Sequence, residues 1–185
     1  MLIPQLSTPR LILRAFNQQD FDAYADMCGD PEVVRYIGYG KPLSREESWR
    51  NLAMMLGHWQ LRGYGMWAVE EKSSGEMIGR IGYWQPEGWP GLEIGWSLRR
   101  QFWGYGYATE GAKAAMAYGF ENWGITELIS LIRPENQASR RVAEKLGEKL
   151  QSAIALLGAE ALVYSINKED FHLDIPPRPK GARIP

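Results

Sequence analysis

The stretch Arg100-Gln101-Phe102-Trp103-Gly104-Tyr105-Gly106-Tyr107-Ala108-Thr109-Glu110 lies between an expected strand and an expected long helix. Gly104 and Gly106 allow the backbone to turn tightly and to come close to a ligand. The first turn of the following helix leaves N–H groups unpaired and carries the positive end of the helix dipole. Together these features predict an anion site, most naturally for a phosphate group.

Two other phosphate motifs do not fit this stretch. A dinucleotide-binding fingerprint needs glycine where Thr109 stands and follows the first strand of a β-α-β unit, whereas this loop follows a strand meander. A mononucleotide P-loop is excluded because no Gly-Lys-Ser or Gly-Lys-Thr follows the glycines. The alternative that stays open is a glycine-containing turn with no ligand.

Before this loop, the sequence pattern predicts helices and then a strand meander. A short strand is expected at 10–14, and helices are expected at 17–27, 30–36 and 44–61. Ser44 and Glu47 have the spacing of a capping box at the start of the third helix. Strands are expected at 66–72, 76–85 and 92–98, the first two joined by a turn at 73–75.

After the loop, the pattern predicts alternating helices and strands. A long helix begins after Gly106, a strand covers 127–133, and a helix covers 136–146 and ends at Gly147. Further strands are expected at 149–155 and 161–167. We therefore expect one α/β domain over residues 1–173, and the proline-rich residues 174–185 are expected to form a flexible tail.

The composition excludes several classes of protein. The chain has 185 residues, 45% hydrophobic and 23% charged, which fits one globular domain rather than a disordered chain. Its net charge of −1 predicts no nucleic-acid partner. No segment has the ~18 consecutive apolar residues of a membrane span or the pattern of a signal peptide, so a cytoplasmic protein without a membrane partner is expected. The single Cys28 predicts a packed thiol, and the isolated His58 and His172 predict no metal site.

Four segments resemble the GNAT superfamily of N-acetyltransferases. Gln101-x-x-Gly104-x-Gly106 matches its coenzyme A pyrophosphate motif, and the string from Phe102 to Glu110 resembles the RimJ/RimL branch, which acetylates protein N-termini. Glu93-Ile94-Gly95-Trp96 and Pro134-Glu135-Asn136-Gln137-Ala138-Ser139 are similar to segments of the same family. Lys145-Leu146-Gly147 is also similar, although Glu148 replaces the usual aromatic residue. The resemblance covers residues 9–171.

This resemblance implies a mixed α/β (α+β) fold with a central, mostly antiparallel sheet of about seven strands, splayed in the middle and flanked by about four helices. It also implies acetyl-CoA as the donor, no metal, and a pantetheine arm in the splay. The implied coenzyme-binding residues are Trp96, Leu98, Gln101, Trp103, Gly104, Tyr105, Gly106, Tyr107, Ala108, Thr109, Asn136 and Ser139.

The implied reaction is attack of a neutral amine on a thioester. Glu93 is the candidate base, acting through a water, and its alternative role is a strand carboxylate in a salt bridge. The helix after Asn136 has no tyrosine, so Ser139 is the hydroxyl that can donate to the departing sulfur, while Asn136 can bond to the pantetheine. The alternative role of both residues is helix capping. Glu110 is expected to interact with the helix dipole rather than to act as a base.

The aromatic residues divide into two groups. Trp84 and Trp89, in and beside a Pro/Gly loop, are expected to line a substrate cleft together with Glu93. A second set has helical spacing and is expected in the core: Trp49, Trp59, Phe120 and Trp123.

The acceptor stays open at this stage. A protein N-terminal α-amine is favoured. A small amine (a polyamine, an amino acid or an aminoglycoside) and a non-catalytic acyl-CoA sensor are the alternatives. A homodimer is implied by the resemblance alone.

Overall fold

The computed structural model describes residues 2–172, so the predicted tail at 174–185 lies outside the described residues. The sequence pattern placed most elements within two residues of their observed bounds. The strands are β1 (Leu6–Ser7), β2 (Leu11–Arg14), β3 (Met66–Glu71), β4 (Met77–Trp84), β5 (Glu93–Leu98), β6 (Glu127–Ile132), β7 (Lys149–Leu156) and β8 (Ala159–Asn167). The helices are α1 (Phe21–Gly29), α2 (Pro31–Val34), α3 (Arg45–Arg62), α4 (Tyr107–Asn122) and α5 (Gln137–Leu146).

The predicted fold class is confirmed, with the five helices that the sequence pattern predicted and one strand more. All eight strands form one sheet in the order β1-β2-β3-β4-β5-β6-β8-β7, and every pair is antiparallel except β5 with β6. The extra strand β1 has two residues and pairs with β2, which is too short for a hydrophobic pattern to reveal. The helix α2, which the pattern predicted at 30–36, is a single turn of four residues.

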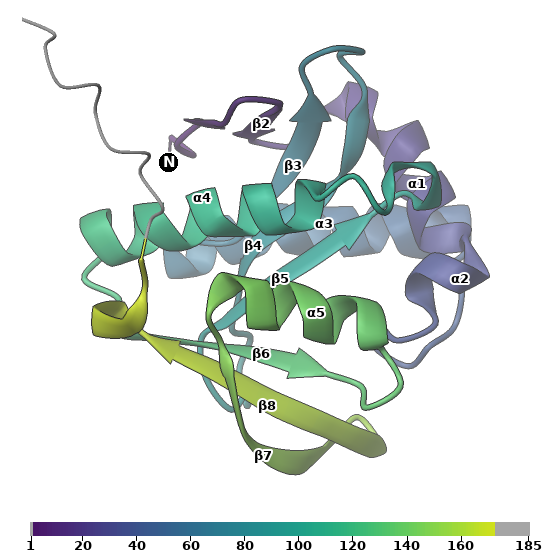
Figure 1. Ribbon diagram of the computed structural model, residues 1–185. Coiled ribbons are helices and arrows are strands. Elements are labelled where there is room, and N and C mark those ends of the chain that lie inside the picture. Colours follow the sequence, from purple (N-terminus) through teal and green to yellow (C-terminus); the bar gives the residue numbers. More distant parts are fainter. Residues whose placement is uncertain (1, 173–185) are drawn as a thin grey trace, which may run out of the picture.

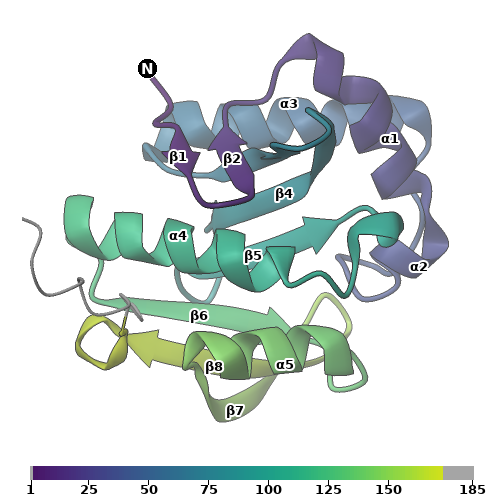
Figure 2. The same cartoon turned by 45° about the horizontal axis from the view of Figure 1, so that its top comes forward.

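The sheet is covered by helices on both faces. Figures 1 and 2 show α4 and α5 on one face, with α1 and α3 on the other. The core on the α4 side includes Ile94, Leu98 and Met116, and the core on the α1 side includes Tyr24, Met27 and Met66. Ile94 and Leu98 of β5 therefore face the α4 side, whereas the Ser97 Oγ lies 3.8 Å from the Met27 Sδ on the α1 side, as the alternation of a pleated strand requires.

Helix α3 is capped as predicted, but its buried stripe is shifted from the expected one. The Ser44 and Glu47 side chains form the capping box, and Gly63 ends the helix in the left-handed conformation. The buried positions include Ser48, Leu52, Met55 and Trp59. Trp49 is 60% exposed, so its assignment to the core was wrong. It lies one residue, or about 100°, away from the buried stripe.

The other predicted core aromatics pack as expected. Trp59 and Phe120 are each 2% exposed. Trp123, just after α4, is partly buried and stacks on Trp67 with the ring planes 2° apart. Cys28 is also buried.

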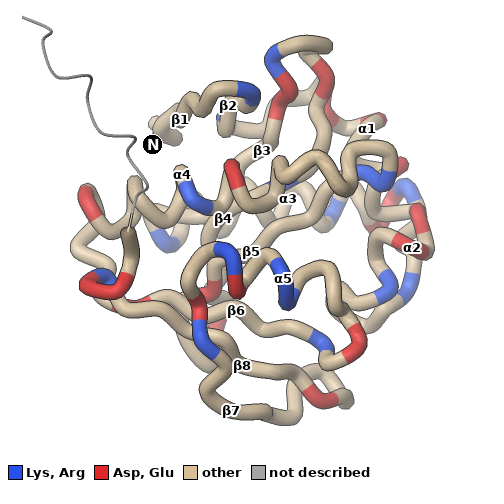
Figure 3. Tube along the Cα trace, viewed as in Figure 1, with Lys and Arg blue, Asp and Glu red and all other residues tan. Residues whose placement is uncertain are grey.

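Positively and negatively charged residues are both distributed over the fold. In the view of Figure 3, Lys and Arg segments alternate with Asp and Glu segments. Of the helices in residues 2–172, none is long and apolar enough to cross a bilayer.

The strands β5 and β6 separate almost as soon as they meet. Their parallel pairing has one registered pair, Glu93 with Ile129, supported by the bond from the Ile129 N–H to the Leu92 carbonyl at 3.0 Å. Beyond this pair the two strands diverge, as Figure 2 shows, and they enclose the splay that the family resemblance implied.

Candidate functional site

The loop before α4 is open where a ligand phosphate would approach. Gly104 and Gly106 adopt φ values of +84° and +82°, a region that L side chains rarely occupy. A Cβ added at Gly104 would meet nothing within 4 Å. The N-terminus of α4 has no side-chain cap, so its first N–H groups remain available to an anion.

Arg10 holds this loop, a role that the sequence did not reveal. Its guanidinium donates to the Tyr105 carbonyl at 2.9 Å, and its Nη2 lies 3.6 Å from the position of a Cβ on Gly106. Glu110 accepts from the Arg10 Nε at 2.6 Å and from the Thr8 hydroxyl at 2.6 Å. Glu110 therefore anchors the N-terminal segment to α4.

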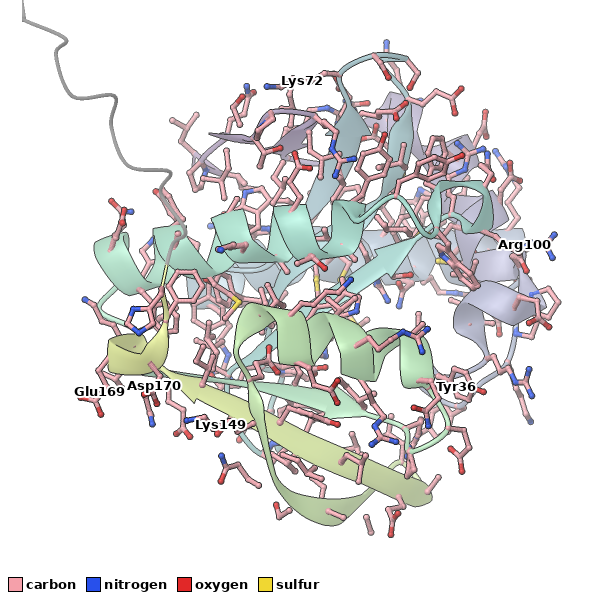
Figure 4. All side chains as sticks on the ribbon, in the orientation of Figure 1. Tyr36, Lys72, Arg100, Lys149, Glu169 and Asp170 are labelled. Atoms are coloured by element: carbon pink, nitrogen blue, oxygen red, sulfur yellow. The ribbon has the colours of Figure 1, made fainter. Side chains whose placement is uncertain are left out.

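The aromatic residues of the loop point in different directions. Tyr105 is 61% exposed and stacks on Tyr107 with centroids 5.8 Å apart, whereas Tyr107 is buried and its hydroxyl bonds to Glu71. Trp103 is 45% exposed, and its indole N–H donates to the Leu98 carbonyl at 2.8 Å. Of the other predicted residues, Gln101 is exposed, and Ala108 and Thr109 are half-buried. Arg100, labelled in Figure 4, points away from the body of the protein and pairs with Asp30 at 3.3 Å.

The edge of β5 that faces the splay carries backbone groups without a strand partner. Arg99 donates its N–H to Ile78 of β4, so odd-numbered residues of this stretch pair toward β4. Alternate residues of a strand direct their N–H and C=O groups to opposite sides. Trp96 and Leu98 therefore direct theirs toward the splay, and the Leu98 carbonyl is already bonded by Trp103.

Helix α5 brings its first turn to the other wall of the splay. The Asn136 side chain caps the helix by accepting from the Ser139 N–H at 3.1 Å. The Ser139 Oγ accepts from the indole N–H of Trp96 at 3.3 Å, which links α5 to β5 across the splay. Because Oγ accepts this bond, the Ser139 proton remains able to donate elsewhere.

Glu93 lies where the two strands part, on the α1 side of the sheet. Its carboxylate accepts from the Trp89 indole N–H at 2.8 Å. Burial raises the pKa of Glu93 to about 7, against the opposing effects of the Trp89 bond, a bond from the Leu131 backbone and the positive charge of Arg80. A carboxyl with a pKa near 7 can exchange a proton at neutral pH.

The three residues predicted for the acceptor side come together. Trp84 is registered opposite Glu93 in the β4–β5 pair, and Trp89 bonds to Glu93 directly. Trp84 stacks on the His58 ring with centroids 4.6 Å apart. His58 is itself fixed, because its Nε2 accepts from the Gln85 N–H at 3.2 Å and its Nδ1 lies 2.9 Å from the Tyr64 carbonyl.

Two residues near Glu93 were missed by sequence reasoning. Arg80 lies on the same face of the sheet and donates to the Tyr24 hydroxyl at 2.9 Å and the Asn51 Oδ1 at 3.3 Å. The sequence feature that could have identified Arg80 is its place as a charged residue inside the apolar run 77–84. Glu148 is 3% exposed and lies near the same point on the α5 side. The sequence feature that could have identified Glu148 is a carboxylate at a position where the family resemblance implies an aromatic ring.

The comparisons with known proteins agree on one family. The model of the acetyltransferase (GNAT) domain matches residues 10–149. The uncharacterized protein YkkB of Bacillus subtilis is 34% identical over 168 residues, covering 86% of this chain and 94% of that protein.

Solved structures share the fold over almost the whole chain. An acetyltransferase from Agrobacterium tumefaciens is 34% identical with a TM-score of 0.81, covering 90% of this chain and 96% of its own. RimL, a ribosomal L7/L12 α-N-protein acetyltransferase solved with coenzyme A, has a TM-score of 0.75 at 21% identity, covering 89% of this chain and 98% of its own. At that identity the second match shows a common fold alone.

Proposed function

The chain belongs to the GNAT family of acetyltransferases, and we propose that it transfers an acetyl group from acetyl-CoA to the α-amine of a protein N-terminus. The enzyme is an N-acetyltransferase, and the donor follows from the family, whose domain uses acetyl-CoA. The observation that carries the choice of acceptor is Glu93, a carboxyl with a pKa of about 7 at the opening of the splay.

Three features of the chain fit the donor. The open glycines at 104 and 106 and the uncapped start of α4 suit a pyrophosphate. The free edge of β5 suits the amides of a pantetheine arm, with the Trp96 backbone and the Leu98 N–H as partners. When bound, acetyl-CoA supplies a thioester carbonyl to the amine.

Glu93 is the proposed general base. A protein α-amine has a pKa of about 7.7–8.0, so moving its proton to a carboxyl with a pKa of about 7 costs about 1 kcal/mol. A lysine amine has a pKa of about 10.4, and the same transfer costs about 5 kcal/mol. The base is therefore matched to an α-amine, and a water between the two groups completes the path.

Ser139 is the proposed donor to the departing sulfur. The coenzyme A thiol has a pKa of about 8.5, so protonating the departing thiolate at pH 7 lowers its free energy by about 2 kcal/mol. A hydrogen bond from a hydroxyl is sufficient to stabilise a leaving group of this basicity. The Ser139 Oγ accepts a hydrogen bond from the Trp96 indole, and the Ser139 N–H donates to the Asn136 side chain. Asn136 and Trp96 thus act through Ser139 by fixing its orientation.

A small amine that carries a carboxylate is the second candidate acceptor, and Arg80 is the observation that favours it. The side chains that accept from its guanidinium, Tyr24 and Asn51, are neutral. The carboxylate whose charge acts on it is Glu93. An amino acid could therefore place its amine at Glu93 and its carboxylate toward Arg80.

A panel of acceptors tests the assignment through release of free coenzyme A thiol. The panel holds a lysine-free peptide with an open N-terminus, an N-acetylated peptide with one lysine, an amino acid, a polyamine and an aminoglycoside. We expect the open peptide to have the highest kcat/KM. A tenfold preference for any small amine overturns the protein acceptor, and micromolar coenzyme binding without turnover indicates an acyl-CoA sensor.

Glu93→Gln tests the base in the same assay. Loss of a general base lowers the rate by about 10²–10⁴-fold. We expect kcat/KM of the native protein to fall tenfold per pH unit below about 7, as Glu93 is protonated. Equal activity of Glu93→Gln and the native protein would remove Glu93 from the reaction.

A further inference from the structure

Glu148 is a carboxyl buried without enough donors to be an anion. Its Oε1 lies 3.0 Å from the Ser130 Oγ. Its Oε2 is buried and has no hydrogen-bond partner among residues 2–172. The side chain follows Gly147 at the end of α5, and the Glu148 N–H is itself bonded to the Ala143 carbonyl. An ionised carboxylate in such surroundings would be costly, because burying an incompletely bonded charge is unfavourable.

The hydrogen bonds around Ser130 require a proton on Glu148. The Ser130 Oγ lies 2.9 Å from the Ile94 carbonyl as well as 3.0 Å from Glu148. A hydroxyl has one hydrogen, whereas a carbonyl and a carboxylate are both acceptors. Both contacts are satisfied only when Glu148 donates its own proton to Ser130 and Ser130 donates to Ile94.

This chain of hydrogen bonds ends where β5 and β6 part. Ile94 follows Glu93, the last residue of β5 in register with β6, and Ser130 follows its partner Ile129. The hydroxyl of Ser130 therefore joins the two strands one residue beyond their backbone pairing. On the other face of the sheet, the Leu131 backbone bonds to the Glu93 carboxylate. The position of the proposed base thus depends on how this junction is held.

The charges around Glu148 agree with a neutral acid. Burial raises its pKa to about 8, with the Ser130 bond opposing and the negative charge of Glu93 adding to the rise. From β8, Tyr164 is registered opposite Ser130, and from α5, Arg140 bonds to the Tyr164 hydroxyl. In residues 2–172, no Lys or Arg forms an ion pair with Glu148. Lys149, labelled in Figure 4, is exposed.

We propose that Glu148 is a positioning residue that, as a neutral acid, directs the Ser130 hydroxyl to the Ile94 carbonyl and so fixes the junction beside Glu93. Loss of the Glu148 proton turns the Ser130 hydrogen toward the carboxylate, because a charged acceptor forms the stronger bond. The Ile94 carbonyl then loses its partner and the junction loosens. The effect on catalysis rests on the proposed function, whereas the protonation of Glu148 does not.

Infrared spectroscopy tests the proton directly, without any acceptor. The difference spectrum between the native protein and Glu148→Gln should contain a protonated-carboxyl band at pH 7. As the pH is raised, this band should disappear, with a midpoint more than two pH units above 4.5, the ordinary pKa of glutamate. A band that is absent at pH 7 overturns the proposal, whether or not the protein transfers acetyl groups.

The pH dependence of kcat tests the positioning role. The kcat of the native protein is divided by the kcat of Glu148→Gln at each pH, so that the titration of the acceptor cancels. This ratio should fall several-fold between pH 7 and pH 9, because the native carboxyl loses its proton whereas the glutamine amide keeps donating to Ser130. Ser130→Ala should have several-fold lower kcat at pH 7 and lose this dependence. A flat ratio, or full activity of Ser130→Ala at pH 7, overturns the positioning role. If no amine is acetylated, the proposed function fails, and the infrared result still decides the state of Glu148.

Discussion

Replacing Glu148 with glutamine should make the protein more stable at neutral pH. Glutamine has almost the same shape and can donate to the Ser130 Oγ, as the protonated glutamic acid does. It removes the cost of keeping a titratable carboxyl neutral in the fold. Because Glu148 is 3% exposed, solvent screening does little to reduce that cost.

The size of the effect follows from the pKa of Glu148 in the two states. The carboxyl ionises near 4.5 in the unfolded chain, and burial raises this pKa to about 8 in the fold. Its contribution to stability is therefore complete below 4.5 and is lost progressively as pH rises toward 8. At pH 7 the loss is about 3 kcal/mol, so Glu148→Gln should gain up to about that much.

Urea unfolding at a series of pH values measures this gain. The free energy of unfolding of Glu148→Gln should match that of the native protein near pH 4 and exceed it increasingly up to pH 8. Glu144→Gln, an exposed position on α5, is the matched control and should show no such divergence. A gain that does not depend on pH, or a glutamine variant that is less stable at pH 7, would show that Glu148 is not held neutral in the fold.

Three further changes probe the loop, the base and the sulfur donor. Gly106→Val should abolish acetyl-CoA binding in calorimetry. Gly106 has a φ of +82°, which strains a β-branched residue by about 1–2 kcal/mol, and the valine side chain would fill the space through which the phosphate approaches. Gly124→Val is the control, because Gly124 has a φ of +64° and lies away from the site, and this variant should bind acetyl-CoA normally. Arg80→Met should move the acid limb of kcat/KM to higher pH, because the positive charge that lowers the pKa of Glu93 is gone, and Arg80→Lys should not. Ser139→Ala should lower kcat several-fold, and an unchanged kcat would exclude it from the reaction.

The order of the elements and the loop before α4 could be predicted from the amino-acid sequence. Its signals are local: glycine tolerates positive φ at 104 and 106, and Ser44 with Glu47 caps a helix within one turn. The resemblance to the GNAT family rests on segments of this kind. The predicted acceptor-side residues Trp84, Trp89 and Glu93 were also placed together because they are close in sequence.

The surroundings of the point where β5 and β6 part could be read only from the folded chain. Ser130 and Glu148 meet from separate elements, and Arg80 influences Glu93 from the neighbouring strand. Such contacts depend on strand register and on how α5 returns to the sheet, and a sequence pattern specifies neither. Burial is likewise a property of the assembled layers, which is why Trp49 is exposed and the pKa of Glu148 is raised.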